Sequence, residues 1–231
     1  MSDDGGQAAG RAFDPTTTAM MPSELVTRFI LLRHGEVESF GERVVRGQLD
    51  AALSEDGVRQ HERLVAWLSE HETAPDVLFS SDLTRCARLA ALVGEAFDVT
   101  PSCTERLREQ SMGRWQGRTW SDISAEDGPL VTAYWDDYAN NAPPEGESLL
   151  DLSQRIGAWY EETLAAHAGR TIFVSTHIGV IRTLLCRLLG VAPTDALRFA
   201  PAVASSTEVL VSEAGAVLTR LGERPWTWSE R

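Results

Sequence analysis

The chain has 231 residues, of which 43% are hydrophobic and 24% charged, and its formal net charge is −13 at pH 7. This length allows one substantial hydrophobic core. The acidic balance argues against a nucleic acid or an anionic membrane surface as partner, because both favour basic proteins. An acidic protein can still bind a phosphate ester if its arginines are concentrated in one pocket.

The three cysteines, Cys86, Cys103 and Cys186, form no paired motif, which is typical of reduced thiols in a cytoplasmic protein. The start of the chain lacks the basic and apolar segments of a secretory signal, and no stretch approaches the apolar length that spans a bilayer. Residues 1–23 are rich in Gly, Ala, Asp and Thr. We interpret them as a disordered leader and residues 24–231 as a single domain.

Short apolar runs alternate with segments of helical periodicity along the chain. In chain order, the first predicted elements are a strand at residues 29–32, a helix after Ser54, a strand at 77–79 and a helix capped by residues 80–82. A helix after Ser148, a strand at 171–175 and a helix through Leu189 follow. The chain closes with a hairpin or two edge strands at 208–211 and 217–221. This alternation predicts an α/β protein, a three-layer α/β/α sandwich around a mainly parallel central sheet.

Polar residues suited to phosphate follow three of the predicted strands. These pairs are Arg33-His34, Ser80-Ser81 and Thr176-His177. In a parallel sheet the ligand site lies beyond the carboxyl ends of the strands. The sequence therefore predicts one site to which all three strand ends contribute.

Cleavage of a phosphate monoester needs a nucleophile, cations around the phosphoryl oxygens, and a proton for the leaving alkoxide. A neutral imidazole such as that of His34 is a good nucleophile near pH 7. Arg33 and Arg85 offer charged, planar groups that match phosphate oxygens, and Glu109 could hold the proton. No cluster of carboxylates or histidines has the spacing of metal ligands, so we predict no metal and no other cofactor.

Six motifs occur in a fixed order from about Val26 to Leu221. They are residues 32–36 (Leu-Arg-His-Gly-Glu), Leu53-Ser54 followed by Gly57, residues 80–85, residues 107–109 with 113–117, residues 145–148, and residues 175–182. Together they resemble the histidine phosphatase superfamily, which contains the cofactor-dependent phosphoglycerate mutases and many phosphatases. The resemblance implies that His34 is the phosphorylated nucleophile and Glu109 the proton donor. It also implies that Arg33, Arg85 and His177 hold the phosphoryl oxygens.

Three departures from the family pattern occur. Where relatives often have Asn a few residues after the signature, this chain has Ser39 and Phe40. Ile178 stands where the family usually has Gly after the second histidine, although its N–H could still point at a phosphate. Arg46 precedes Gly47 where many relatives have Gln or Ser, in a loop that relatives place near the phosphoryl group. We therefore expect Arg46, Gly47 and Ile178 to bind substrate. An inward Arg46 would favour a substrate with a second anionic group, whereas an outward Arg46 would pair with Asp50 or Glu42.

Two alternatives to a phosphatase were considered, a cofactor-dependent phosphoglycerate mutase and a catalytically silent phosphate-binding module. Mutases resemble one another in a histidine-tyrosine pair after the catalytic glutamate, where this chain has residues 110–112, and in a long basic insertion before Glu145, where this chain is short. The intact His34, Glu109 and His177 argue against a silent module. We predict hydrolysis of a small phosphorylated metabolite through a phosphohistidine, with the particular ester left open.

Other residues have structural interpretations. His61 is predicted to be a structural histidine beside an apolar helix face. The tail from Gly222 is expected to be a packed extension or part of a homodimer contact. Four aromatic residues fall where relatives build the pocket lid, and each could either contact substrate or pack in the core. They are Trp115, Trp120, Trp135 and Tyr138.

Overall fold

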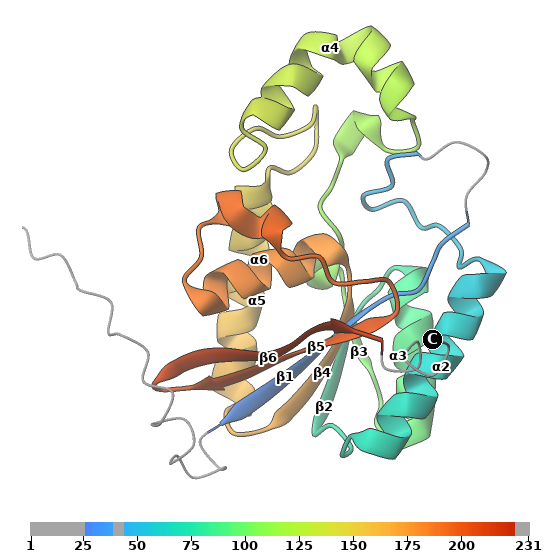
Figure 1. The fold of residues 1–231 in the computed structure, drawn as a ribbon, viewed down its shortest axis with the longest axis vertical. Helices are drawn as coiled ribbons and strands as arrows, with labels where there is room; N and C mark the ends of the chain where they lie inside the picture. Colours follow the sequence, from blue (N-terminus) through green and yellow to red (C-terminus); the bar gives the residue numbers. More distant parts are fainter. Residues whose placement is uncertain (1–25, 39–43, 225–231) are drawn as a thin grey trace, which may run out of the picture.

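Within residues 26–38 and 44–224, which the computed structural model describes, a six-stranded sheet runs through the centre of the fold (Figure 1). Its strands are β1 (Thr27–Arg33), β2 (Val77–Ser81), β3 (Ser102–Thr104), β4 (Thr171–Thr176), β5 (Ser205–Ser212) and β6 (Gly215–Glu223). Their spatial order is β3-β2-β4-β1-β5-β6. The first four run parallel to one another, and β5 and β6 add an antiparallel hairpin beside β1. The mainly parallel sheet and the closing hairpin are both confirmed.

Helices cover both faces of this sheet. They are α2 (Glu55–His71) and α3 (Thr84–Phe97) on one face, and α5 (Leu149–His167) and α6 (Ile178–Leu189) on the other. The side chains of β1 alternate between the two layers, because successive residues of a strand point to opposite faces. Phe29 and Leu31 pack with α5 and α6. Ile30 and Leu32 pack with α2 and α3. The apolar run of β1 is thus buried on both faces, and the three-layer sandwich is confirmed.

Side-chain caps begin two helices where the sequence predicts them. Ser54 caps α2, and Ser148 caps α5 in a reciprocal capping box with Asp151. The predicted cap of the next helix is wrong, because α3 follows Leu83, which makes no side-chain cap bond. Residues 80–82 do not serve as caps, since the two serines are the last residues of β2.

A further helix, α4 (Trp120–Asp136), lies outside the two helical layers, at the top of Figure 1. It covers a small separate core that includes Trp115, Ile123 and Tyr134. The sequence pattern does not predict α4, because Pro129 interrupts its periodicity and the backbone at Asp127 departs from helical geometry. The short elements β3 and the 3-10 helices η2 (Glu105–Leu107), η3 (Gly113–Trp115) and η4 (Pro193–Arg198) were also missed.

The predicted leader at residues 1–23, and the tail beyond residue 224, lie outside the described residues. In the part of the chain that the structure describes, no helix combines the length and apolar character needed to cross a membrane.

Candidate active site

A pocket of about 830 Å³ opens beyond the carboxyl end of β1. Seven of the eight predicted site residues line it, and the eighth, His177, lies buried beneath. The lining residues from that prediction are Arg33, His34, Arg46, Gly47, Arg85, Glu109 and Ile178. The wall also includes Glu36, Val37, Val44, Trp120 and Val203. Residues that are up to 170 positions apart in the sequence therefore meet at the predicted edge of the sheet.

His34 follows the last residue of β1 and is buried in the floor of the pocket. Its Nδ1 lies 2.7 Å from the carbonyl oxygen of Gly35. A carbonyl only accepts hydrogen bonds, so Nδ1 carries the ring hydrogen and Nε2 keeps its lone pair. Burial, and then the nearby charge of Arg85, lower the pKa of His34 to about 3. The imidazole is therefore neutral at pH 7, as a nitrogen nucleophile must be.

Arg33 and Arg85 bring positive charge to the same floor. Arg33 donates from Nη1 to the carbonyl oxygen of Pro201 at 2.7 Å, while its buried Nε–H has no hydrogen-bond partner among the described residues. Arg85, in the first turn of α3, donates to the carbonyl oxygens of Leu49 (2.7 Å) and Gly47 (2.8 Å). Burial lowers the pKa of both guanidinium groups, but the ordinary value is so high that both stay charged. Both arginines line the pocket, where a planar cation suits an anion.

His177 lies behind Arg85 and contacts protein groups through both ring nitrogens. Nδ1 accepts the Nε–H of Arg85 at 3.3 Å, and Nε2 lies 2.9 Å from the hydroxyl oxygen of Ser81. Burial, and then His34 and Arg85, hold the pKa of His177 well below its usual value. As placed, His177 orients Arg85 and packs edge-on against His34, with the ring centroids 5.2 Å apart. A direct contact between His177 and a phosphoryl oxygen stays a prediction.

Glu109 lies against the N-terminus of α6. Its two carboxylate oxygens accept the backbone N–H of Gly179 at 3.1 and 3.2 Å. A Cβ on Gly179 would come within 2.2 Å of the carboxylate, so glycine is needed for this approach. Ile178 is the first residue of α6 and lines the pocket. Its N–H belongs to the first turn, whose amides have no intrahelical partner and lie at the positive end of the helix dipole.

Arg46 and Gly47 form the loop opposite His34. Gly47 has φ +51°, and a Cβ there would lie 2.5 Å from the side-chain oxygen of Gln116, so both conformation and space require glycine. Arg46 lines the pocket and donates to the carbonyl oxygen of Glu38. Asp50, one of the surface partners considered for Arg46, instead accepts both the N–H and the hydroxyl of Thr84. The other, Glu42, lies outside the described residues.

The aromatic residues of the predicted lid separate into two groups. Trp120 lines the pocket. Trp115 is fully buried in the core beneath α4, where its Nε1–H donates to Asp127 at 2.9 Å. Tyr138 donates its hydroxyl to the carbonyl oxygen of Thr194, and Trp135 is half exposed on α4. Of the four, only Trp120 is placed to contact a ligand in the pocket.

Two residues that support the site were not recognised from the sequence. His61 is fully buried, as expected of a structural histidine, but its Nε2 accepts the N–H of Gly35 at 2.7 Å, next to His34. Arg155 binds the backbone that carries Glu109. For both His61 and Arg155, the sequence offers one indication of such a role. Each is a polar residue in a helix that mostly buries apolar side chains.

Across the described residues, 26–38 and 44–224, no three His, Cys, Asp or Glu side chains are grouped so that they could hold a metal ion. The polar groups of the pocket are instead guanidinium groups, an imidazole, two carboxylates and helix-terminal amides. The site places a buried neutral imidazole among arginines at the end of a parallel strand. This arrangement is typical of α/β enzymes that transfer phosphoryl groups.

Comparison with known proteins gives the family. Residues 29–224 match the model of the histidine phosphatase superfamily (branch 1), and the chain belongs to this family. It is 33% identical over 177 residues to the glucosyl-3-phosphoglycerate phosphatase of Mycolicibacterium vanbaalenii, covering 74% of this chain and 77% of that one. It is 30% identical over 163 residues to the adenosylcobalamin/alpha-ribazole phosphatase of Salmonella typhimurium, covering 70% and 79%.

The fold agrees with this assignment. The crystal structure of a putative alpha-ribazole-5'-P phosphatase from Escherichia coli superposes with a TM-score of 0.79 at 26% identity, covering 86% of this chain and 97% of that chain. The predicted family is confirmed, and the chain is a phosphatase of this superfamily, that is, a phosphoric monoester hydrolase. These relatives favour the phosphatase interpretation over the mutase alternative.

Proposed function

We propose that this chain hydrolyses a small phosphorylated metabolite by transferring the phosphoryl group first to Nε2 of His34 and then to water. The observation that carries the proposal is the hydrogen bond between Nδ1 of His34 and the Gly35 carbonyl. This bond fixes the tautomer, so the lone pair of Nε2 is available without any prior proton transfer. The arrangement supports His34 as nucleophile, Glu109 as acid and base, and Arg33 and Arg85 as phosphoryl-binding groups.

In the first step the lone pair of Nε2 forms a bond to phosphorus while the ester P–O bond breaks. The leaving oxygen takes the proton of the Glu109 carboxyl group. In the second step the Glu109 carboxylate takes a proton from water, whose oxygen attacks phosphorus as the N–P bond breaks. His34 returns to its neutral state, and Nδ1 keeps its hydrogen throughout.

Glu109 suits both directions of this proton transfer. A phosphate dianion in the pocket favours the protonated carboxyl group, because two negative charges repel each other. The N–H of Gly179 and the positive end of α6 favour the carboxylate once the proton has left. The same residue can therefore give a proton in the first step and accept one in the second.

Charge on the phosphoryl oxygens would be stabilised from several directions. Arg33 lines the pocket and can direct its guanidinium at a bound phosphoryl group. Three of the five N–H groups of Arg85 are used by Gly47, Leu49 and His177, which leaves two. The N–H of Ile178 adds a backbone donor at the start of α6. This supports a mechanism in which the protein supplies the positive charge itself, without a metal ion.

The pocket is larger than a phosphoryl group and has both apolar and charged walls. Val37, Val44 and Trp120 provide apolar surface, and Arg46 provides a further charge. This supports a small organic phosphate whose alcohol part fills the remaining space, and an inward Arg46 supports a second anionic group on that part. The name of one relative, glucosyl-3-phosphoglycerate phosphatase, agrees with a phosphate ester that carries a second anionic group.

The three free cysteines support a reducing, cytoplasmic setting. A homodimer stays a prediction.

The phosphohistidine can be trapped directly. Enzyme mixed with p-nitrophenyl phosphate and quenched in denaturant during turnover should gain the mass of one phosphoryl group, located by peptide mapping at His34. The label should be lost in acid and kept in base. His34→Ala should show neither label nor measurable turnover. His71→Ala, which changes an exposed histidine at the end of α2, should retain both. A His34→Ala variant that keeps substantial activity would refute the mechanism.

A further inference from the structure

The segment that carries Glu109 has little regular structure of its own. The 3-10 helix η2 ends at Leu107, and residues 108–112 belong to no helix or strand. The segment is half-buried, so its carbonyl groups need hydrogen-bond partners from elsewhere in the protein. Only such external partners can define where the backbone of Glu109 lies relative to the pocket.

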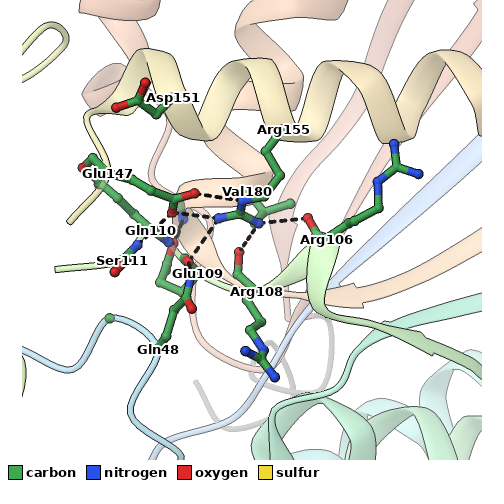
Figure 2. Close-up of polar contacts among 12 residues, drawn as sticks. Gln48, Arg106, Arg108, Glu109, Gln110, Ser111, Glu147, Asp151, Arg155 and Val180 are labelled. Carbon is green, nitrogen blue, oxygen red and sulfur yellow. Dashed lines mark hydrogen bonds and ion pairs between the residues drawn. The ribbon is translucent and has the colours of Figure 1, made fainter. Parts of the chain in front are cut away.

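Arg155, on α5, supplies most of these partners (Figure 2). Its Nη1 donates to the carbonyl oxygens of Arg106 (2.8 Å) and Arg108 (2.9 Å). Its Nη2 donates to the carbonyl oxygen of Glu109 (3.2 Å). The remaining donors bind the carboxylate of Glu147, from Nε and from Nη2, each at 2.8 Å. All five N–H groups of the guanidinium are therefore used, three of them on one stretch of backbone.

Glu147 connects this cation to the other end of the same segment. Its carboxylate accepts the N–H of Ser111 at 2.8 Å, and its carbonyl oxygen accepts the side-chain amide of Gln110 at 2.7 Å. Both Arg155 and Glu147 are about four-fifths buried, so water competes little for these bonds. The pair thus binds residues 106–111 at both ends while the Glu109 side chain extends to α6.

We propose that Arg155 is a positioning residue for Glu109. By fixing the carbonyl groups on either side, it holds the Glu109 carboxyl group against Gly179 and within reach of the leaving oxygen. Arg155 does not line the pocket, so it acts through Glu109 and not on the substrate. The proposal rests on the role of Glu109 as proton donor. A displacement of about 1 Å in such a group can cost about 100-fold in rate.

Arg155→Lys tests this, because lysine keeps the charge but has three donors on one atom and cannot span the carboxylate and three carbonyls. We expect kcat/KM, which reports the first step alone, to fall about 10- to 100-fold for an alkyl phosphate. For p-nitrophenyl phosphate, whose leaving group needs no proton, kcat/KM should fall no more than about threefold. The matched control is Arg187→Lys, another arginine that pairs with a glutamate of α5 but at the exposed surface. It should leave both esters unaffected.

The Glu109→Gln background separates positioning from a general loss of structure. If Arg155 acts through Glu109, Arg155→Lys should cause no further selective loss on the alkyl ester once Glu109 is Gln. An equal loss on both esters, or a selective loss that persists in that background, would overturn the proposal. If Glu109→Gln alone reduces both esters equally, the proton-donor role fails, and the proposal falls with it. Should Arg155→Lys not fold, Glu147→Gln must show the same selective loss on the alkyl ester.

Discussion

The two sides of the pocket are held in place by opposite chemistry. On the nucleophile side, the His34–Gly35 backbone is bound by neutral, buried partners: the ring of His61 and the backbone of Thr176 and Ala204. On the acid side, residues 106–111 are bound by the charged pair of Arg155 and Glu147. Both loops are irregular, and both carry a group that must be placed accurately.

This difference follows from what each group has to do. A nitrogen nucleophile must stay neutral, so it benefits from surroundings that exclude water and disfavour a proton. A carboxyl group that alternates between two protonation states must tolerate charge. Here the two fixed charges are paired with each other, and Arg155 binds backbone carbonyls while Glu147 accepts the N–H of Ser111. The comparison predicts that the nucleophile side is sensitive to acid, and that the acid side is sensitive to loss of charged hydrogen bonds.

The largest expected effect is at the acid side itself. Glu109→Gln keeps the shape of the side chain but removes the proton that an alkoxide leaving group needs. The value of kcat/KM, which reports the first step alone, should fall on the order of 10²- to 10⁴-fold for alkyl phosphates and much less for p-nitrophenyl phosphate. Steady-state kinetics on the two esters measure this. Equal losses in kcat/KM would mean that Glu109 gives no proton to the leaving oxygen.

On the nucleophile side, we expect the free energy of unfolding to depend on pH. Burial, and to a smaller extent Arg88, lower the pKa of His61 to about 4. Between that value and its ordinary pKa of 6.5, the unfolded chain binds a proton that the folded chain does not. The free energy of unfolding should therefore decrease as the pH falls from 6.5 to 4, with a contribution from His61 of about 3 kcal/mol.

His61→Gln, which does not titrate, should remove that contribution and flatten the decrease. Denaturant unfolding at a series of pH values measures it, with His71→Gln, an exposed histidine of the same helix, as control. A His61→Gln protein whose stability depends on pH as strongly as the wild type would show that His61 is not held neutral by its surroundings.

A smaller and more selective effect is expected at Arg46, which lines the pocket. Arg46→Gln should reduce kcat/KM about 10- to 100-fold for a carboxylate-bearing phosphate ester and little for an ester of a neutral alcohol, since a charged hydrogen bond contributes about 1.5–3 kcal/mol. A comparison of the two esters measures this. A similar loss on both would place Arg46 at the phosphoryl group, and no loss on either would make it a surface residue.

No effect is expected from removing metal ions. Both sides of the pocket supply charge from side chains, so activity should be unchanged after dialysis against EDTA. Phosphate release before and after dialysis, and after addition of Mg²⁺ or Zn²⁺, provides the measurement. A loss that either ion restores would show that a cation completes the site.

Much of this architecture could be predicted from local sequence features. The apolar run of residues 29–32 predicted a strand buried on both faces, and Ser54 and Ser148 marked the helix starts. These signals are local because burial and capping depend on residues within one strand or one turn. The cap predicted at residues 80–82 failed because Ser81 belongs to a strand end and contacts His177. α4 was missed because Pro129 obscures its periodicity.

The sequence by itself predicted which residues would carry the chemistry: a histidine and an arginine at the end of β1, with a second arginine and a glutamate in later motifs. Only the tertiary structure decided how they are held. Arg155 reaches the carbonyl of Glu109 across 46 positions, and His61 reaches the amide of Gly35 across 26. The backbone of an irregular loop has no periodic partner of its own, so its hydrogen bonds are completed by whichever distant side chains the fold brings alongside, and no local pattern records that choice.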